Sequence, residues 1–186
     1  IEPHNRPDTE ALREGLEEIP PLMVDYKGIQ LREFDLDAAL KRRPQLLLVD
    51  ELAHTNVRGC RNEKRYQDVM ELLQAGISVY TTVNVQHLES LNDIVASITG
   101  VTVQERIPDF VFDQADQVEV IDIEPDDLIR RMKEGKIYGE SQAERALSNF
   151  FRREKLVALR EIALRRTADR VSRMAEEERS LSDNQD

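Results

Sequence analysis

The chain has 186 residues, of which 40% are hydrophobic and 34% are charged, and its formal net charge is −11. This length suits one ordinary domain with a helical tail, and no window approaches the ~20 apolar residues that span a bilayer, so we expect a soluble segment. The single cysteine, Cys60, excludes an internal disulfide framework and fits a reducing cytoplasm.

Strand and helix patterns alternate along the first 138 residues. A helix is expected to begin at Pro7, a hairpin to turn at Lys27 and Gly28, and a second helix to be capped near Asp35. The later expected elements are a strand at 46–49, a helix at 66–73, a strand at 77–85, a helix at 88–98, strands at 101–103 and 118–123, and a helix at 126–133. This alternation predicts an α/β fold with a doubly wound, mostly parallel sheet flanked by helices.

The sequence pattern changes at Ser141, where a capping-box pattern begins a stretch without glycine or proline. We expect a long C-terminal helix there, ending near Met174. Apolar residues recur every seven positions without a second such line, which favours a helix that packs on the domain over a coiled coil. The predicted organisation is a sensor-type domain at 1–138, a helical connector at 139–174 and a disordered tail at 175–186.

Charge is distributed unevenly along the chain. Residues 1–127 contain 26 acids and 12 bases, whereas residues 128–174 contain 6 acids and 13 bases. The acidic part discourages binding to nucleic acid, because phosphate repulsion would oppose it. The bases, which include Arg152, Arg153, Arg165 and Arg166, could meet anionic lipid, an acidic partner or the chain's own acids, or form a solvated helix face.

The most informative stretch is the apolar run from Leu46 to Val49, which ends on two adjacent carboxylates, Asp50 and Glu51. Four consecutive aliphatic residues suit a buried parallel strand, and its carboxyl end is where open α/β sheets bind ligands. There Asp50 would hold Mg²⁺ through water, and Glu51 would orient a water for attack. The alternative is a strand end at which two acids meet solvent.

A second polar cluster follows the next predicted strand and contains Thr82, Asn84 and His87. The carboxyl ends of parallel strands meet at one edge of a sheet, so these side chains are expected near Asp50. Hydroxyl and amide groups there could bind a γ-phosphate or a water. The alternative is a strand edge with satisfied hydrogen bonds, in which His87 caps a helix.

Three segments taken together, residues 47–56, 64–69 and 71–93, closely resemble the amino-terminal cytoplasmic domain of the KdpD family of potassium-sensor histidine kinases. The likeness extends over most of residues 1–138. Departures are modest: Cys60 and Asn62 stand where the family commonly has serine and histidine.

The resemblance implies a P-loop NTPase-like domain of a membrane-anchored, two-component sensor, in which ATP tunes the balance of kinase and phosphatase activity under potassium or osmotic stress. It implies ATP and Mg²⁺ as cofactors of the full-length parent. Its partners would be the other domains of the kinase and a response regulator. The implied cofactor-binding positions are Asp50 and Glu51, as Walker B-type acids, and His54, Thr55, Thr82, Asn84 and His87.

One motif is absent from this sequence, the phosphate loop Gly-x-x-x-x-Gly-Lys-[Ser/Thr], whose amides cradle phosphates. In the family this loop lies upstream of Glu2, and a sequence that begins at Ile1 reads as a fragment. We therefore expect no nucleotide on this chain, a catalytic role for Glu51 only with the upstream loop, and an acid pair at an exposed sheet edge.

The leading functional hypothesis is a regulatory, nucleotide-sensing cytoplasmic segment of a potassium-responsive sensor histidine kinase. The sequence leaves open whether it belongs to an enzyme of its own, because it has no complete catalytic site and all three histidines lie in its first half. One alternative is a stand-alone P-loop ATPase with Glu51 as base. The other is a protein-interaction module that does not depend on nucleotide.

Overall fold

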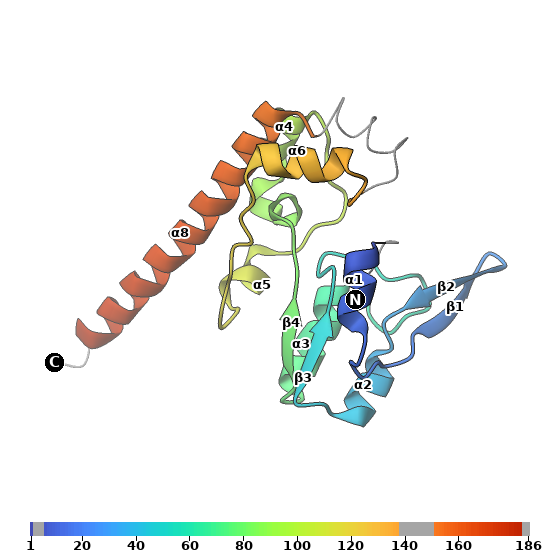
Figure 1. Ribbon diagram of the computed structural model, residues 1–186. Coiled ribbons are helices and arrows are strands. Elements are labelled where there is room, and N and C mark those ends of the chain that lie inside the picture. The colour runs from blue at the N-terminus through green and yellow to red at the C-terminus, as the bar shows by residue number, and fades with distance from the viewer. Residues whose placement is uncertain (2–5, 138–150, 184–186) are drawn as a thin grey trace. The chain divides into compact units, whose positions relative to one another are not determined.

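The computed structural model describes residue 1, residues 6–137 and residues 151–183 (Figure 1). The chain divides into two compact units. The first consists of residues 1–87 and 104–107, and the second of residues 88–103 and 108–186. The predicted boundary at residue 138 lies outside the described residues and stays a prediction.

The first unit opens with a short helix and a hairpin (Figure 1). Helix α1 spans Pro7–Arg13, and strands β1 (Leu22–Tyr26) and β2 (Ile29–Glu33) pair antiparallel. The two turn residues, Lys27 and Gly28, have φ angles of 53° and 81°. Two successive positive φ angles define the tight turn that matches the twist of the flanking strands, so the predicted hairpin is confirmed.

A parallel strand pair forms the rest of the first unit. Helix α2 (Leu36–Arg42) is capped by Asp35, whose carboxylate accepts a hydrogen bond from an amide of the first turn at 2.9 Å. Strand β3 (Leu46–Val49) pairs in parallel with β4 (Ser78–Thr81), and α3 (Arg65–Gln74) lies between them in the chain. A parallel pair needs such a crossover, which α3 supplies.

The two faces of this parallel pair differ in burial. Leu72 of α3 and Ile77 are buried in the core of the unit, on the side where α3 packs against β4. On the strands themselves, Leu46, Leu48 and Tyr80 are 46%, 44% and 67% exposed. Parallel sheets are normally covered on both faces, so this apolar surface is unusual for the strand type that carries it.

A doubly wound sheet is not formed by the described residues, which contain two separate sheets of two strands each. Residues 101–103 and 118–123, both predicted as strands, have no regular secondary structure. Ile121 is 88% exposed, and none of these residues pairs in a described ladder. A β-branched run becomes a strand only beside a hydrogen-bonding neighbour, which local sequence does not specify. The P-loop NTPase-like architecture therefore stays a prediction.

The second unit is helical. Its elements are the helical turn η2 (Glu89–Leu91), α4 (Asn92–Thr99), α5 (Asp109–Asp113), α6 (Pro125–Lys133) and the long helix α8 (Arg153–Asp183). Helices α4 and α6 both contact α8, on which Leu156 and Leu159 are buried. In the described part of the chain, no helix has the length and apolar composition needed to cross a membrane.

Helix α8 corresponds in part to the predicted long helix. Residues 141–150 of that prediction lie outside the described residues. At the other end, α8 continues to Asp183, through positions where a disordered tail was expected from residue 175. Glutamate is the commonest residue there and no glycine or proline interrupts the segment, so its composition permits the helix to continue.

The basic residues of α8 pair with acids of their own unit. Arg160 binds Asp122 and Glu124 at 2.7 and 2.8 Å, and Arg153 binds Asp126 at 3.0 Å. Of the binding partners considered for the basic stretch, the chain's own acids are therefore the ones that pair with these side chains. The opposite charges of the two parts of the sequence thus meet within one unit.

Arg166 is among the most buried of these bases, with its side chain 7% exposed. It donates to Asp109 at 3.2 Å and to Asp113 at 2.8 Å, and its guanidinium lies 4.6 Å from the ring centroid of Phe112. Asp109 also accepts hydrogen bonds from the amide and the hydroxyl of Ser90, at 2.9 and 2.6 Å. The cluster joins α8, α5 and η2.

Acid is expected to weaken this cluster. Burial alone would raise the pKa of Asp109, but hydrogen bonds from Ser90 and then from Arg166 outweigh it and hold the pKa below the ordinary 3.8. A carboxylate with a lowered folded-state pKa stabilises the fold above its unfolded pKa, and that contribution is lost as the pH falls through the folded pKa. We expect the free energy of unfolding to decline below about pH 4, measured by urea denaturation across pH.

Asp109→Asn should make this acid decline shallower, whereas Asp8→Asn, which changes an exposed carboxylate of α1, should leave it unchanged. An equally steep decline in wild type and Asp109→Asn would contradict the assignment.

Candidate functional site

The acid pair lies directly beyond β3 and is joined to the end of β4. The Thr82 hydroxyl donates a hydrogen bond to Oδ1 of Asp50. The amide of Glu51 donates to the same oxygen at 3.1 Å and to the Thr82 hydroxyl oxygen at 3.3 Å. The structure therefore brings Asp50, Glu51 and Thr82 together, as expected for adjacent carboxyl ends of parallel strands.

Glu51 adopts an unusual backbone conformation, with φ at 55°. A residue with a Cβ seldom occupies this left-handed region, and such residues concentrate at functional sites, where the surrounding structure holds them. The amide of the next residue, Leu52, donates to the Thr82 carbonyl at 2.9 Å, and the His54 amide donates to the Glu51 carbonyl at the same distance. These bonds fold the chain sharply after β3.

The polar cluster after β4 is held by a segment from later in the chain. Helical turn η1 spans Val85–His87, and the His87 amide donates to the Asn84 carbonyl at 3.0 Å. Nδ1 of His87 lies 2.7 Å from the carbonyl oxygen of Glu105, so Nδ1 carries the proton and donates. The Glu105 carboxylate accepts the Thr55 amide at 2.8 Å. Glu105 thereby joins the loop after β3 to the turn after β4.

A small cavity of about 130 Å³ opens between these loops. Five of the seven predicted residues line it, whereas Asp50 and Thr55 do not. Thr55 instead accepts a hydrogen bond from Nζ of Lys64 at 2.6 Å. The residues that line the cavity are Glu51, Leu52, Ala53, His54, Thr82, Val83, Asn84, His87 and Glu105.

Two acids at this site were not predicted from the sequence, Glu33 and Glu105. Glu33 ends β2 and is buried, and Glu105 belongs to a stretch without regular secondary structure. Neither follows an apolar strand of the parallel pair, which was the signal that identified Asp50. Their partners lie at least 18 residues away along the chain, so no local pattern reports them.

The loop between β3 and α3 is organised around a buried carboxylate, Asp68. It accepts hydrogen bonds from the side-chain amides of Asn56 and Asn62 at 2.8 and 2.9 Å. Burial raises the pKa of Asp68, and these two hydrogen bonds oppose the rise. Burial, followed by the charges of Glu33 and Asp68, also raises the pKa of Cys60. Both departures from the family pattern, Cys60 and Asn62, therefore belong to this structural loop, and neither lines the cavity.

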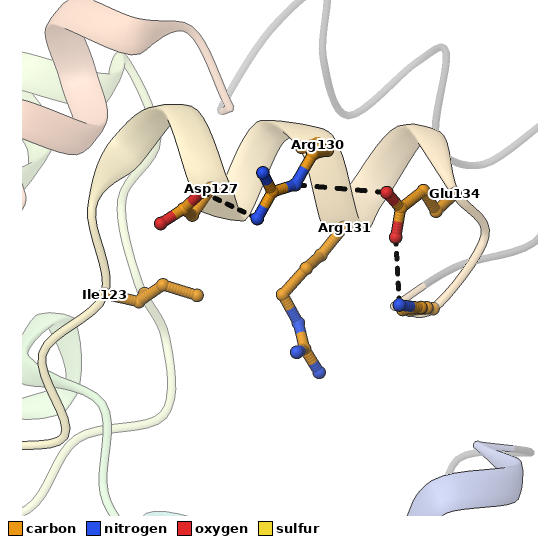
Figure 2. A pocket seen from close by; sticks show the side chains of 6 residues that line it. Ile123, Asp127, Arg130, Arg131 and Glu134 are labelled. Atoms are coloured by element: carbon orange, nitrogen blue, oxygen red, sulfur yellow. Dashed lines mark ion pairs between the residues drawn. The ribbon is translucent and has the colours of Figure 1, made fainter.

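A second, more open hollow of about 430 Å³ lies beside α6 in the helical unit (Figure 2). Arg130 pairs with Asp127 at 2.8 Å, and Lys136 pairs with Glu134 at 3.0 Å. Figure 2 shows Arg131 pointing away from these pairs. None of the residues predicted as functional lines this hollow.

Residues 1–171 match the family model described as KdpD, osmosensitive K⁺ channel His kinase sensor domain. The chain belongs to this family. The resemblance drawn from the motifs after β3 and β4 is thereby confirmed.

Curated relatives agree with the family assignment. The chain is 64% identical over 172 residues to the sensor protein KdpD of Clostridium acetobutylicum and 60% identical over 171 residues to that of Escherichia coli, covering 92% of the chain in both comparisons. Identity to the Mycobacterium tuberculosis sensor protein KdpD is 53% over 169 residues, or 91% of the chain. The matches cover only 19–20% of these three proteins, so the chain spans about a fifth of their length.

Proposed function

We propose that the chain is the nucleotide-sensing regulatory segment of a potassium or osmotic-stress sensor histidine kinase and acts only as part of that longer protein. The observation that carries the proposal is the convergence of Asp50, Glu51 and Thr82 at the carboxyl ends of two parallel strands. Family membership supports the sensor-kinase context. In this proposal, nucleotide binding modulates the balance between kinase and phosphatase activity.

The chemistry of the side chains fits Mg²⁺ and ATP. Mg²⁺ prefers hard oxygen ligands and retains several waters, and it is commonly held by one or two carboxylates together with substrate phosphates. Asp50 would hold the ion through water beside the Thr82 hydroxyl, and Glu51 would orient a water in the adjacent cavity. Bound Mg²⁺ would supply neutralisation of phosphate charge. His54, Thr55, Asn84 and His87 would shape the surroundings of the terminal phosphate.

The exposed apolar face of β3 and β4 supports the same proposal. Leu46, Leu48 and Tyr80 form a surface of the kind that a further layer covers in parallel-sheet proteins. A strand and helix carrying the phosphate loop would cover it in the full-length protein. The parent's other domains, and a response regulator, would then receive the signal.

The proposal predicts the effects of two substitutions in the full-length parent kinase. Asp50→Asn should weaken Mg²⁺-dependent ATP binding by roughly 10- to 100-fold, because an interaction with a charged group contributes about 1.5–3 kcal/mol. Glu51→Gln should bind ATP with little change, because its carboxylate acts on water rather than on the nucleotide. Isothermal titration calorimetry with and without Mg²⁺ measures both effects.

A matched control is Glu63→Gln, which changes an exposed carboxylate of the same loop that does not line the cavity. Tight binding with negligible turnover supports a sensor. ATP hydrolysis that is lost in Glu51→Gln would instead support a P-loop ATPase. If the parent shows no ATP-dependent thermal shift, the nucleotide proposal fails and an interaction module replaces it.

A further inference from the structure

Glu33 is a buried carboxylate at the end of an otherwise exposed hairpin. Its side chain is 2% exposed, whereas most residues of β1 and β2 face solvent. Burying an ionised carboxylate is costly unless hydrogen bonds and opposite charges compensate it. The burial of Glu33 therefore depends on the groups that bind its carboxylate.

Among the described residues, three donors contact this carboxylate, and all three come from outside the hairpin. The Val57 amide donates to it at 2.9 Å, and the Arg65 guanidinium approaches it at 3.4 Å. Nε2 of His54 lies 3.0 and 3.1 Å from its two oxygens. A carboxylate accepts only, so Nε2 carries the proton and donates. Two of the three donors belong to the loop that follows the acid pair, and the third opens α3.

Two short connections lead from these donors to the acid pair. Arg65 also donates to the backbone carbonyl of Asp50 at 3.1 Å. The amide of His54 donates to the carbonyl of Glu51, and its own carbonyl accepts the Arg65 amide at 3.1 Å. The backbone of both acids is therefore bonded to groups that Glu33 binds.

The backbone of Glu51 needs such support. Its positive φ is a conformation that costs roughly 1–3 kcal/mol and persists only where neighbouring structure imposes it. Hydrogen bonds to His54 and Thr82 fix the two sides of this turn. Of the two, the His54 side is anchored to a buried charge.

We propose that Glu33 is a positioning residue, through which the β1–β2 hairpin holds the loop of residues 51–57 in the shape that presents Glu51 and His54 to the cavity. The hairpin is thereby coupled to the candidate site. The structural part of this inference is independent of any ligand. Its consequence for ATP binding rests on the function proposed above.

The first test measures backbone order by amide hydrogen exchange in the 186-residue chain. Glu33→Gln preserves shape but removes the charge that His54 and Arg65 bind. Amides of residues 51–57 should exchange roughly tenfold faster, and those in the middle of α3 should change by less than about threefold. Asp37→Asn serves as the control, since Asp37 is an exposed carboxylate that also pairs with an arginine, Arg61, at 2.7 Å.

A second variant guards against loss of folding in Glu33→Gln, which leaves Arg65 buried beside a neutral group. His54→Leu removes the Nε2 donor of this contact at a partly exposed side chain, and should increase exchange in the same loop. Unchanged exchange at residues 51–57 in either folded variant overturns the proposal. Faster exchange spread equally over α3 and the loop, or unfolding of both variants, assigns Glu33 a structural role and also overturns it.

The third measurement uses the full-length parent and ATP. Glu33→Gln should weaken ATP binding by about tenfold, with the Asp37→Asn protein unchanged. If the wild-type parent does not bind ATP, the proposed function fails, while the exchange result still decides the role of Glu33. If the parent binds ATP and Glu33→Gln binds it equally well, the coupling of hairpin and site is wrong.

Discussion

Replacing Arg166 with alanine is expected to reduce the stability of the helical unit by about 3–5 kcal/mol, the cost typical of removing one partner from a buried ion pair. The substitution leaves Asp109 and Asp113 without their shared guanidinium and removes the contact with Phe112. Urea denaturation followed by amide signals from α8 measures the loss. We expect the midpoint to fall with little change in the slope.

The adjacent residue offers a matched control. Arg165 is 71% exposed, and among the described residues it pairs with Glu161, one helical turn earlier. Exposed pairs of this kind contribute about 0.3–0.5 kcal/mol, so Arg165→Ala should be nearly neutral. Similar effects of the two substitutions would mean that Arg166 does not anchor α8.

Leu72→Ala is expected to destabilise the first unit by about 2–5 kcal/mol, because it removes apolar atoms from a fully buried position and leaves a cavity. Leu72 lies on the face of α3 that packs against the parallel strands. The prediction is tested by urea denaturation, followed through amides of β3 and β4, which should lose protection together.

Leu73→Ala is the control for this second prediction, because Leu73 follows directly in α3 and is 45% exposed. Both substitutions make the same chemical change in the same helix, so they differ chiefly in burial. A cost below 1 kcal/mol for Leu72→Ala, or equal costs for both, would show that this face of α3 is not the core of the unit.

The strongest local signals in the sequence were also the most accurate. The run from Leu46 to Val49 became a strand as expected, although only Val49 of its four residues is buried, and the Lys27-Gly28 turn produced the hairpin. Asp35 capped its helix as expected. The turn and the cap depend on interactions within a few residues, which the local sequence specifies directly, whereas the strand also needs its partner β4.

The predicted sheet was larger than either sheet observed, because a segment joins a sheet only where a neighbouring strand forms hydrogen bonds with it. Residues 118–123 have the composition of a strand, yet no described strand lies beside them to accept their hydrogen bonds. Burial of Arg166 was equally hidden from the sequence, since its partners Asp109 and Asp113 lie more than 50 residues away. Charge counts showed that the two parts of the chain differ in sign, but not which residues would pair.

By itself the sequence determined the family, the strand that ends on Asp50 and Glu51, and the expectation that Thr82 would lie beside them. These follow from short motifs and from the geometry common to parallel strands. Only the tertiary structure decided that Glu33 and Glu105 hold the loops around the acid pair. A buried carboxylate is held by hydrogen-bond donors that folding brings from distant parts of the chain, and no local sequence pattern predicts those contacts.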